Sequence, residues 1–340
     1  MPRRTQFVVG GVLAAVLVGW FLWSADLPEV AGVLRATNLA GVGLACLTVG
    51  FTSLQRAWRW RRLLAPLGSF AVRDLWAAIL MGWSVSLLPG RLGEIARPIF
   101  LSRRAPISAS AGLGSVVLER VFDVVAILVL LAGYLLLAPP PPVLSAAGLS
   151  TLTILRSVGM GLLAALLAGG VLAMLAARDE ALCARLGGFM VRRLPARLSG
   201  LLVSFLSGMS GLRSPLGVGR ILISSVVLWA TVVLTYVTLF AAVGLAVPWY
   251  GAIPLLTLLV IGAAVPTPAG VGAFHKAAQV GLVGLFAVPN DDAVAYAILG
   301  HAVAFLPLAA VGLLLIVRAG LSAELFADME RTLDKQEIRE

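Results

Sequence analysis

The sequence predicts an all-helical, polytopic membrane protein with about six spanning helices and two opposed re-entrant helical hairpins in an inverted-topology repeat. Three observations predict this class. The chain has 340 residues, of which 60% are hydrophobic and only 12% are charged, whereas soluble domains have about 45–50% and about 25%. Long apolar runs recur along the chain, and basic residues gather between some runs and are missing between others. This composition excludes a soluble enzyme, a disordered chain and a secreted disulfide scaffold.

Six uninterrupted apolar runs are long enough to cross a bilayer, which requires about 20 predominantly apolar residues. The first run follows Arg3 and Arg4, and no small-x-small cleavage site comes after it, so we interpret it as a retained helix and not as a signal peptide. The six runs cover residues 7–23, 38–55, 115–137, 157–177, 221–246 and 293–317.

Two further apolar stretches, 75–101 and 250–288, are interrupted by proline and glycine. Each half is short for a full crossing, which favours a re-entrant helix–break–helix hairpin in both places. The alternative is that the second stretch crosses the membrane twice, which would give eight spanning helices. The residues that make the breaks are Pro89, Gly90, Gly93, Pro266, Pro268, Gly270 and Gly272.

The positions of arginine and lysine set the predicted orientation. The net charge is +10, and we attribute it to membrane orientation and anionic lipid headgroups, with no nucleic-acid partner. The positive-inside rule places both termini in the cytoplasm, and we expect the protein to lie in the inner (plasma) membrane. The first hairpin then enters from the cytoplasmic side and the second from outside. Basic residues concentrate in 1–6, 56–73, 178–220 and 318–340, and none occurs in 138–153, 247–254 or 289–292.

These elements predict a single integral membrane domain, residues 1–320. Its halves, 1–137 and 154–320, have the same element order in opposite orientation, which is typical of transporters with substrate sites at paired broken helices. Residues 178–220 are expected to form a cytoplasmic amphipathic loop on the membrane surface, and residues 321–340 a cytoplasmic tail.

Ionisable residues in or beside the apolar runs are the candidate substrate-binding residues, because such groups are costly in a bilayer unless they are paired or hydrated. Arginine suits bidentate contacts with phosphate, and neighbouring carboxylates can balance its charge. The alternative is a structural ion-pair cluster that holds the first hairpin to the third span. The residues of this group are Arg91, Glu94, Arg97, Glu119, Arg120 and Asp123.

His275 and Lys276 follow the second break and complete the candidate site. A histidine there can carry a proton, although a satisfied interior polar group is the more frequent role for a lone histidine. For Arg91, Arg103 and Arg104, ordinary anchoring at the cytoplasmic surface is the competing role. No nucleotide-binding, hydrolase or metal-ligand motif occurs in the sequence, so we expect no cofactor, no metal and no catalytic residues.

Three segments carry a family pattern. Residues 88–97 read LPGRLGEIAR, residues 118–123 read LERVFD and residues 265–274 read VPTPAGVGAF. In this order they resemble the Pro-Gly-x-x-Gly-Glu-x-x-Arg, Glu-Arg-hydrophobic-x-Asp and Pro-x-Pro-Gly-Gly-x-Gly segments of the flippase-like family named for the transmembrane region of lysylphosphatidylglycerol synthase, without the aminoacyl-transfer domain. That family usually has Gly and Glu where this chain has Ala269 and His275.

The resemblance implies a membrane domain that moves aminoacylated phosphatidylglycerol between leaflets, while relatives are linked to polyprenol- or dolichol-linked glycans. We therefore expect a lipid flippase or translocase, not an enzyme, that moves a phospholipid or a polyprenyl-phosphate-linked lipid. Its expected partners are membrane lipids with phosphate-containing headgroups and a lipid synthase or glycosyltransferase. A membrane enzyme or accessory subunit in glycolipid or cell-envelope lipid assembly is the alternative, and a scaffold that recruits a synthase through residues 178–220 is a third.

Overall fold

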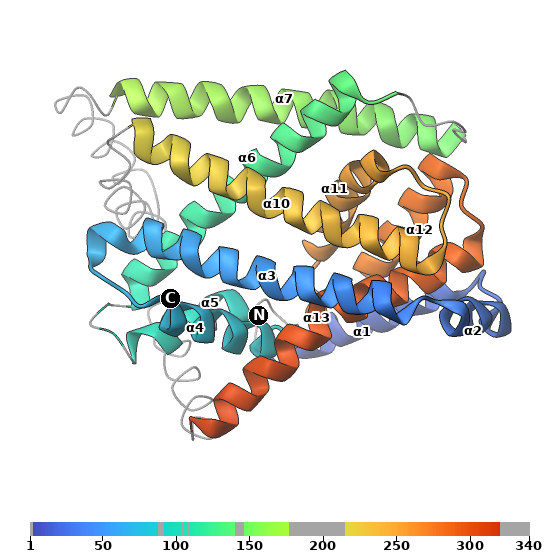
Figure 1. Cartoon of the computed structure of the whole chain (residues 1–340), viewed down its shortest axis with the longest axis horizontal. Helices are drawn as coiled ribbons and strands as arrows, with labels where there is room; N and C mark the ends of the chain where they lie inside the picture. Colours follow the sequence, from blue (N-terminus) through green and yellow to red (C-terminus); the bar gives the residue numbers. More distant parts are fainter. Residues whose placement is uncertain are drawn as a thin grey trace.

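Every regular element in the described part of the chain is a helix (Figure 1). The computed structural model describes residues 3–87, 92–103, 105, 107, 109–139, 146–176 and 215–319. The helices are α1 (Arg3–Leu22), α2 (Leu27–Ala36), α3 (Leu39–Leu64), α4 (Val72–Val85), α5 (Leu92–Ser102), α6 (Ala109–Leu137), α7 (Ala146–Ala176), α10 (Pro215–Val243), α11 (Ala252–Ala263), α12 (Ala273–Phe286) and α13 (Asn290–Arg318), with 3₁₀ turns η1 (Ala65–Leu67), η3 (Trp249–Gly251) and η4 (Pro268–Gly270).

Four of the described helices, α6, α7, α10 and α13, are long and apolar enough to cross a membrane. Two bent pairs raise this number to six if each pair is one span: α1 with α2, bent by 86°, and α3 with α4, bent by 115°. The six predicted runs fall on α1, α3, α6, α7, α10 and α13. The all-helical, multi-pass class predicted from the sequence is therefore confirmed.

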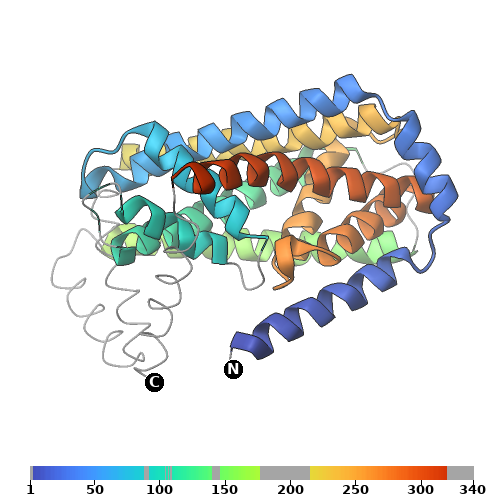
Figure 2. The ribbon, with the colours of Figure 1, turned by 90° about the horizontal axis from the view of Figure 1, so that it is seen from below.

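The short helix α2 was not predicted from the sequence. Asp26 caps its start by accepting a hydrogen bond from the Glu29 amide at 3.4 Å, and Pro28 occupies its first turn, a position that suits proline. Asn38 then caps α3 by accepting hydrogen bonds from the first amides of that helix. As a result, α2 stands at one end of the molecule between α1 and α3 (Figure 2).

Both interrupted apolar stretches form helical hairpins, α4 with α5 and α11 with α12. In each hairpin a glycine lets the two helices approach closely. A Cβ atom at Gly93 of α5 would collide with the Gly82 carbonyl of α4, and a Cβ at Gly262 of α11 would lie 2.7 Å from the Ala273 carbonyl oxygen of α12. The predicted helix–break–helix pattern is therefore present in both stretches.

The tips of the two hairpins meet inside the molecule. The α4–α5 hairpin lies near the end where α3 finishes, and the α11–α12 hairpin lies nearer the end where α10 finishes (Figure 1). The backbone amide of Ala269, in the second break, donates a hydrogen bond of 3.0 Å to the carbonyl of Ser86, in the first. This bond joins the two breaks directly.

The apolar core has two main parts. The larger joins α10, α11, α12 and α13, where Phe240, Leu255 and Tyr296 are buried, and the second packs the first hairpin against α3, where Trp60 and Leu75 are buried. Helix α7 lies outside this core, since only 11% of its most apolar window is buried against 44% for α10. An apolar helix with this exposure is suited to contact with lipid.

Several predicted features fall outside the described residues. These are the tail 321–340, Pro89, Gly90, Arg91 and Arg104. Most of the predicted loop 178–220 also falls outside them, and its last part, 215–220, forms the start of α10.

The contact between α13 and α4 gives a stability prediction. A Cβ at Gly312 would collide with the Leu80 carbonyl and the Ser84 hydroxyl. Because a backbone carbonyl cannot move without disturbing α4, we expect Gly312→Ala to lower the free energy of unfolding by about 1–3 kcal/mol. Thermal unfolding in detergent measures this. The control is Gly133→Ala on α6, where nothing lies within 4 Å, and it should be neutral or stabilising. Equal losses in both variants would contradict the close contact.

Candidate functional site

Seven charged side chains meet among the described residues of α3, α5 and α6 and form a network of ion pairs. We call this network the charge cluster. The guanidinium groups outnumber the carboxylates by four to three, so the cluster carries one excess positive charge when all its members are ionised. Its members are Arg56 and Arg59 on α3, Glu94 and Arg97 on α5, and Glu119, Arg120 and Asp123 on α6.

Glu119 is the most enclosed member, with a side chain that is 0% exposed. Both terminal nitrogens of Arg97 donate to its two oxygens at 3.2 and 3.0 Å. Arg120 donates to it at 2.8 Å, and Nη2 of Arg59 lies 3.2 Å away. Three arginines from three helices therefore surround one carboxylate.

Asp123, one helical turn further along α6, connects the cluster to α10. It accepts hydrogen bonds from Arg59 at 2.6 Å and from the Trp229 indole at 2.8 Å. Arg59 also donates to the Ser225 hydroxyl at 2.8 Å. The Nη1 atom of Arg56 lies 4.0 Å from Asp123, a longer separation than in the other pairs.

Arg97 is held on both its polar edge and its flat face. Its polar edge forms the paired bonds to Glu119, and its guanidinium carbon lies 5.0 Å from the ring centre of Trp60. The Trp60 indole in turn donates to Ser115 at 2.8 Å. This geometry is that of a structural ion-pair cluster holding the first hairpin to α6, and a phosphate at Arg97 would have to displace Glu119.

Arg120 and Glu94 are the outer members of the cluster, with side chains that are 39% and 41% exposed. They lie 3.7 Å apart. The structure thus brings Glu94, Arg97 and the three charged residues of α6 together as the sequence pattern suggested. Their role in binding substrate stays a prediction.

Arg56 and Arg59 were not among the sequence-predicted site residues. The sequence interpretation ended the second span at residue 55 and placed both arginines in a loop, whereas α3 continues to Leu64 and carries them inside the protein. The buried residues Val49 and Thr52 precede them at helical spacing. That spacing, continued past residue 55, is the signal that would have identified the longer helix.

A central cavity of about 150 Å³ lies between the two hairpins and is also lined by α3, α10 and α13. Trp83 comes from the first hairpin and Phe274 from the second, while Thr52 and Thr235 supply hydroxyl groups. Arg56 is the single charged residue among the described residues that line it. Its guanidinium lies 5.3 Å from the ring centre of Trp229, so the cavity borders the charge cluster.

The second break has an unusual backbone. Ala269 adopts a left-handed conformation with φ +50° and ψ +19°, followed by Gly270 at φ +73° and Gly272 at φ +83°. Pro266 and Pro268 interrupt the helical hydrogen bonds of this segment, because proline has no amide hydrogen. The carbonyl of Ala269 therefore lies outside a regular helix and is accessible to a side chain from α13.

His275 and Lys276 take different environments beyond the second break. The His275 ring lies 4.6 Å from that of His301 on α13, and the His301 Nε2 is 2.9 Å from the Ala269 carbonyl. Lys276 donates to Gln279 at 2.7 Å and lies 4.4 Å from the Trp20 ring. Neither residue has a hydrogen bond or ion pair to the charge cluster among the described residues, so the predicted site divides into two places.

Comparison with known proteins places the chain in a family. Residues 7–312 match the family described as the lysylphosphatidylglycerol synthase TM region, which confirms the resemblance seen in the three sequence segments. The chain is also similar to glycosyltransferase AglD of Haloferax volcanii, with 26% identity over 333 residues, covering 89% of this chain and 53% of that protein. The chain thus spans about half the length of that curated relative.

Removal of the Glu119 charge tests the cluster. Glu119→Gln leaves Arg59, Arg97 and Arg120 without their shared carboxylate, and we expect the free energy of unfolding to fall by about 3–5 kcal/mol. Glu94→Gln is the control, because its exposed pair at 3.7 Å is worth less than about 1 kcal/mol. Chemical unfolding in detergent compares the two. A loss below about 1 kcal/mol in both variants would contradict the structural role.

The backbone of the second break predicts a substitution that stabilises the protein. Ala269→Gly should raise the free energy of unfolding by about 0.5–1 kcal/mol, because glycine adopts the left-handed conformation without the cost that alanine carries there. Ala264→Gly, in the same break but at φ −71°, should lower it by a similar amount. Thermal unfolding distinguishes them. Destabilisation by both substitutions would contradict the assigned conformation.

Proposed function

The chain belongs to the lysylphosphatidylglycerol synthase transmembrane-region family, and from this premise we propose that it is a lipid translocase. Its substrate is a lipid with a phosphate-containing headgroup, either a phospholipid or a polyprenyl-phosphate-linked lipid, which it moves between the leaflets of the inner membrane. The single observation that carries the proposal is the contact of the two hairpin tips, Ala269 with Ser86, beside a central cavity that contains Arg56.

The proposed architecture is an inverted-topology repeat, in which α3, the first hairpin and α6 correspond to α10, the second hairpin and α13. Two features support this correspondence. Each hairpin has a close glycine contact between its helices, at Gly82 and Gly93 in one and at Gly262 in the other. The hairpins also approach from opposite ends of the molecule (Figure 1), as expected for sites at paired broken helices.

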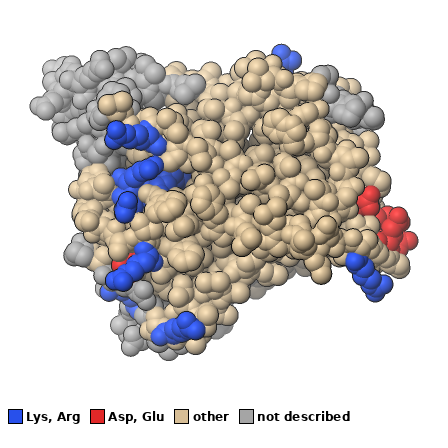
Figure 3. Space-filling model, in the orientation of Figure 1, with Lys and Arg blue, Asp and Glu red and all other residues tan. Residues whose placement is uncertain are grey.

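The proposed orientation has both termini in the cytoplasm. On the face shown in Figure 3, most basic side chains gather at the end where α3 finishes and α10 begins, and acidic side chains gather at the opposite end. Arg61 and Arg62 lie in the last turn of α3, whereas Asp291 and Asp292 lie in the first turn of α13. The positive-inside rule assigns the basic end to the cytoplasm.

In this mechanism Arg56 contacts the phosphate. Its partner Asp123 is 4.0 Å away, while Arg59 holds the same carboxylate at 2.6 Å, so Arg56 is the guanidinium that a substrate can engage at the lowest cost to the cluster. The cavity of about 150 Å³ is smaller than the ~300–1,000 Å³ typical of ligand pockets. Passage of a headgroup therefore requires the hairpin tips to separate, while the acyl chains stay in lipid.

His275 and His301 offer a way to couple this motion to protons. Their rings are 4.6 Å apart, so protonation of one disfavours protonation of the other because like charges repel. His301 also contacts the carbonyl of Ala269. The backbone amide of the same residue, Ala269, forms the hydrogen bond between the tips. A change in the charge of this pair would act directly on the tip contact.

A second candidate function is that of a membrane enzyme or accessory subunit in glycolipid or cell-envelope lipid assembly. The similarity to a protein named glycosyltransferase AglD favours it. In that case the cluster carboxylates would act as acid and base on a lipid phosphate. The two functions differ in product, since an enzyme changes the lipid and a translocase changes only its leaflet.

Leaflet exchange in vesicles tests the proposal. Purified protein reconstituted into unilamellar vesicles should accelerate the exchange of a labelled phospholipid or polyprenyl phosphate at least tenfold over empty vesicles. Arg56→Gln should remove about nine-tenths of this acceleration, because the cavity loses its charge. Arg61→Gln, an exposed arginine at the end of the same helix, is the control and should leave the rate unchanged.

The outcomes separate the candidates. No acceleration by correctly folded protein with either lipid would overturn translocation. A new lipid product detected by mass spectrometry, with unchanged leaflet distribution, would support the enzyme instead. Equal losses in both arginine variants would remove Arg56 from the mechanism.

A further inference from the structure

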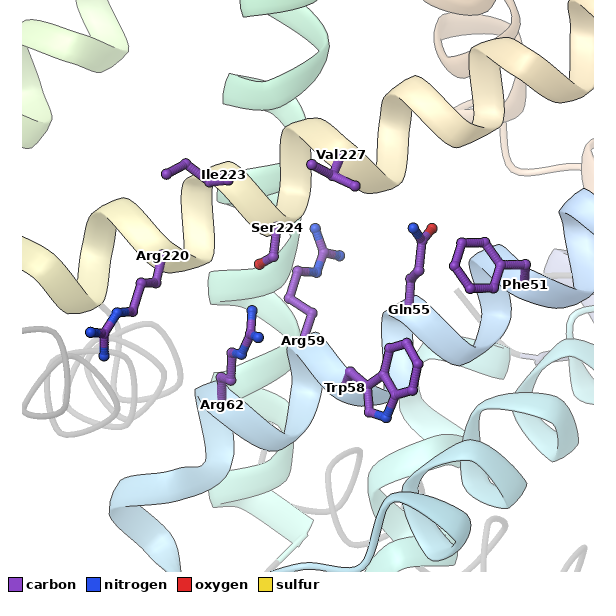
Figure 4. A pocket seen from close by; sticks show the side chains of 9 residues that line it. All are labelled: Phe51, Gln55, Trp58, Arg59, Arg62, Arg220, Ile223, Ser224 and Val227. Carbon is purple, nitrogen blue, oxygen red and sulfur yellow. The ribbon is translucent and has the colours of Figure 1, made fainter.

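A second hollow, separate from the central cavity, lies between α3 and α10 (Figure 4). Its volume is about 670 Å³, and it shares no lining residue with the cavity between the hairpins. We call it the α3–α10 groove. No step of the proposed translocation mechanism uses this groove, so its chemistry needs a separate explanation.

The groove is lined by arginines and has no acidic lining residue among the described ones. Arg62 from α3 and Arg220 from α10 are both exposed at one end of it, and no ion pair joins either to a described carboxylate. Arg59 lies between the two helices (Figure 4), with a side chain that is 1% exposed. Positive charge from two helices converging on one hollow favours an anion.

Unsatisfied polar atoms within the groove give an independent observation. The Nε of Arg59 is buried and has no hydrogen-bond partner, although Nη1 of the same side chain bonds Asp123 and Ser225. The Oε1 of Gln55, one turn earlier on α3, is also buried without a partner. Buried polar groups are normally paired. The donor at Arg59 and the acceptor at Gln55 can therefore each form a hydrogen bond with a polar ligand.

Apart from the half-buried Ser224, the remaining lining is apolar and exposed. Phe51, Ile223 and Val227 are 48%, 65% and 51% exposed, and Trp58 is 43% exposed. Phe51 and Val227 continue the groove along the two helices away from Arg62 and Arg220, whereas Ile223 and Trp58 lie nearer these arginines (Figure 4). A ligand that fits both parts has an anionic head and a hydrocarbon chain.

We propose that the α3–α10 groove binds an anionic phospholipid. Arg62 and Arg220 contact its phosphate, and the Nε of Arg59 supplies a further donor from between the two helices. One acyl chain lies along Val227. A headgroup hydroxyl, as in a glycerol headgroup, satisfies Gln55. Because Arg59 also holds Asp123, the bound lipid adjoins the charge cluster and strengthens the contact of α3 with α10. This binding does not depend on translocation.

Equilibrium binding in detergent tests the groove. Phosphatidylglycerol with brominated acyl chains is titrated in mixed micelles, and quenching of tryptophan fluorescence is recorded. The wild-type protein should show saturable quenching that Trp58→Phe largely removes. The double substitution Arg62→Gln/Arg220→Gln should raise the half-saturation concentration about tenfold, since charge-assisted contacts to phosphate are lost. Arg61→Gln/Arg73→Gln removes the same charge at the same end and should leave it unchanged.

Two further arms identify what is bound. Val227→Trp should obstruct the acyl chain and weaken binding, whereas Val311→Trp, at a comparably exposed position on α13, should not. Brominated phosphatidylcholine should bind at least tenfold more weakly, and millimolar inorganic phosphate should not compete.

Three results would overturn the proposal. Equal losses in both arginine pairs would indicate only general surface charge. Competition by inorganic phosphate would indicate a site for a free anion, and no saturable quenching would indicate an empty groove. Failure of leaflet exchange would leave this binding intact, so the two proposals fail separately.

Discussion

The structure depends on one buried carboxylate, Glu119, and the arginines that surround it. A fully enclosed charge is tolerable only if paired and hydrogen-bonded, and Arg59, Arg97 and Arg120 supply those contacts from three helices. Through them, α3, the first hairpin and α6 are held in one arrangement, and Asp123 extends it to α10. Two members of this network border the hollows of the molecule, since Arg56 lines the central cavity and Arg59 lines the groove.

The hairpin tips are the second constraint. Among the residues that the structure describes, their contact includes a backbone hydrogen bond from the Ala269 amide to the Ser86 carbonyl, in contrast with the many charge-assisted bonds of the cluster. A net contribution of about 0.5–1.5 kcal/mol is typical of such a bond. The molecule thus combines a firmly connected charge cluster with a tip contact that, in the proposed mechanism, separates to admit the substrate headgroup.

The two proposed places for lipid phosphate differ in geometry and adjoin the same cluster. Arg56 faces the enclosed cavity between the hairpins, and Arg62 with Arg220 faces the open groove between α3 and α10. Arg59 stands between them and is bound to Asp123. A lipid in the groove and a headgroup in the cavity would thus act on one network, and occupancy of the groove would give membrane composition a route to the proposed translocation cavity.

The sequence alone is enough to predict the membrane class, the helical hairpins and the grouping of Glu94, Arg97 and the charged residues of α6, because apolar run length, proline, glycine and helical spacing are local properties. Which groups complete the cluster depends on how distant helices pack together. Arg59 and Ser225 are separated by 166 residues in the chain and bond at 2.8 Å, and no local pattern relates them. Burial of Arg59, the meeting of the tips and the α3–α10 groove all arise from packing between distant helices, which no local pattern in the sequence records.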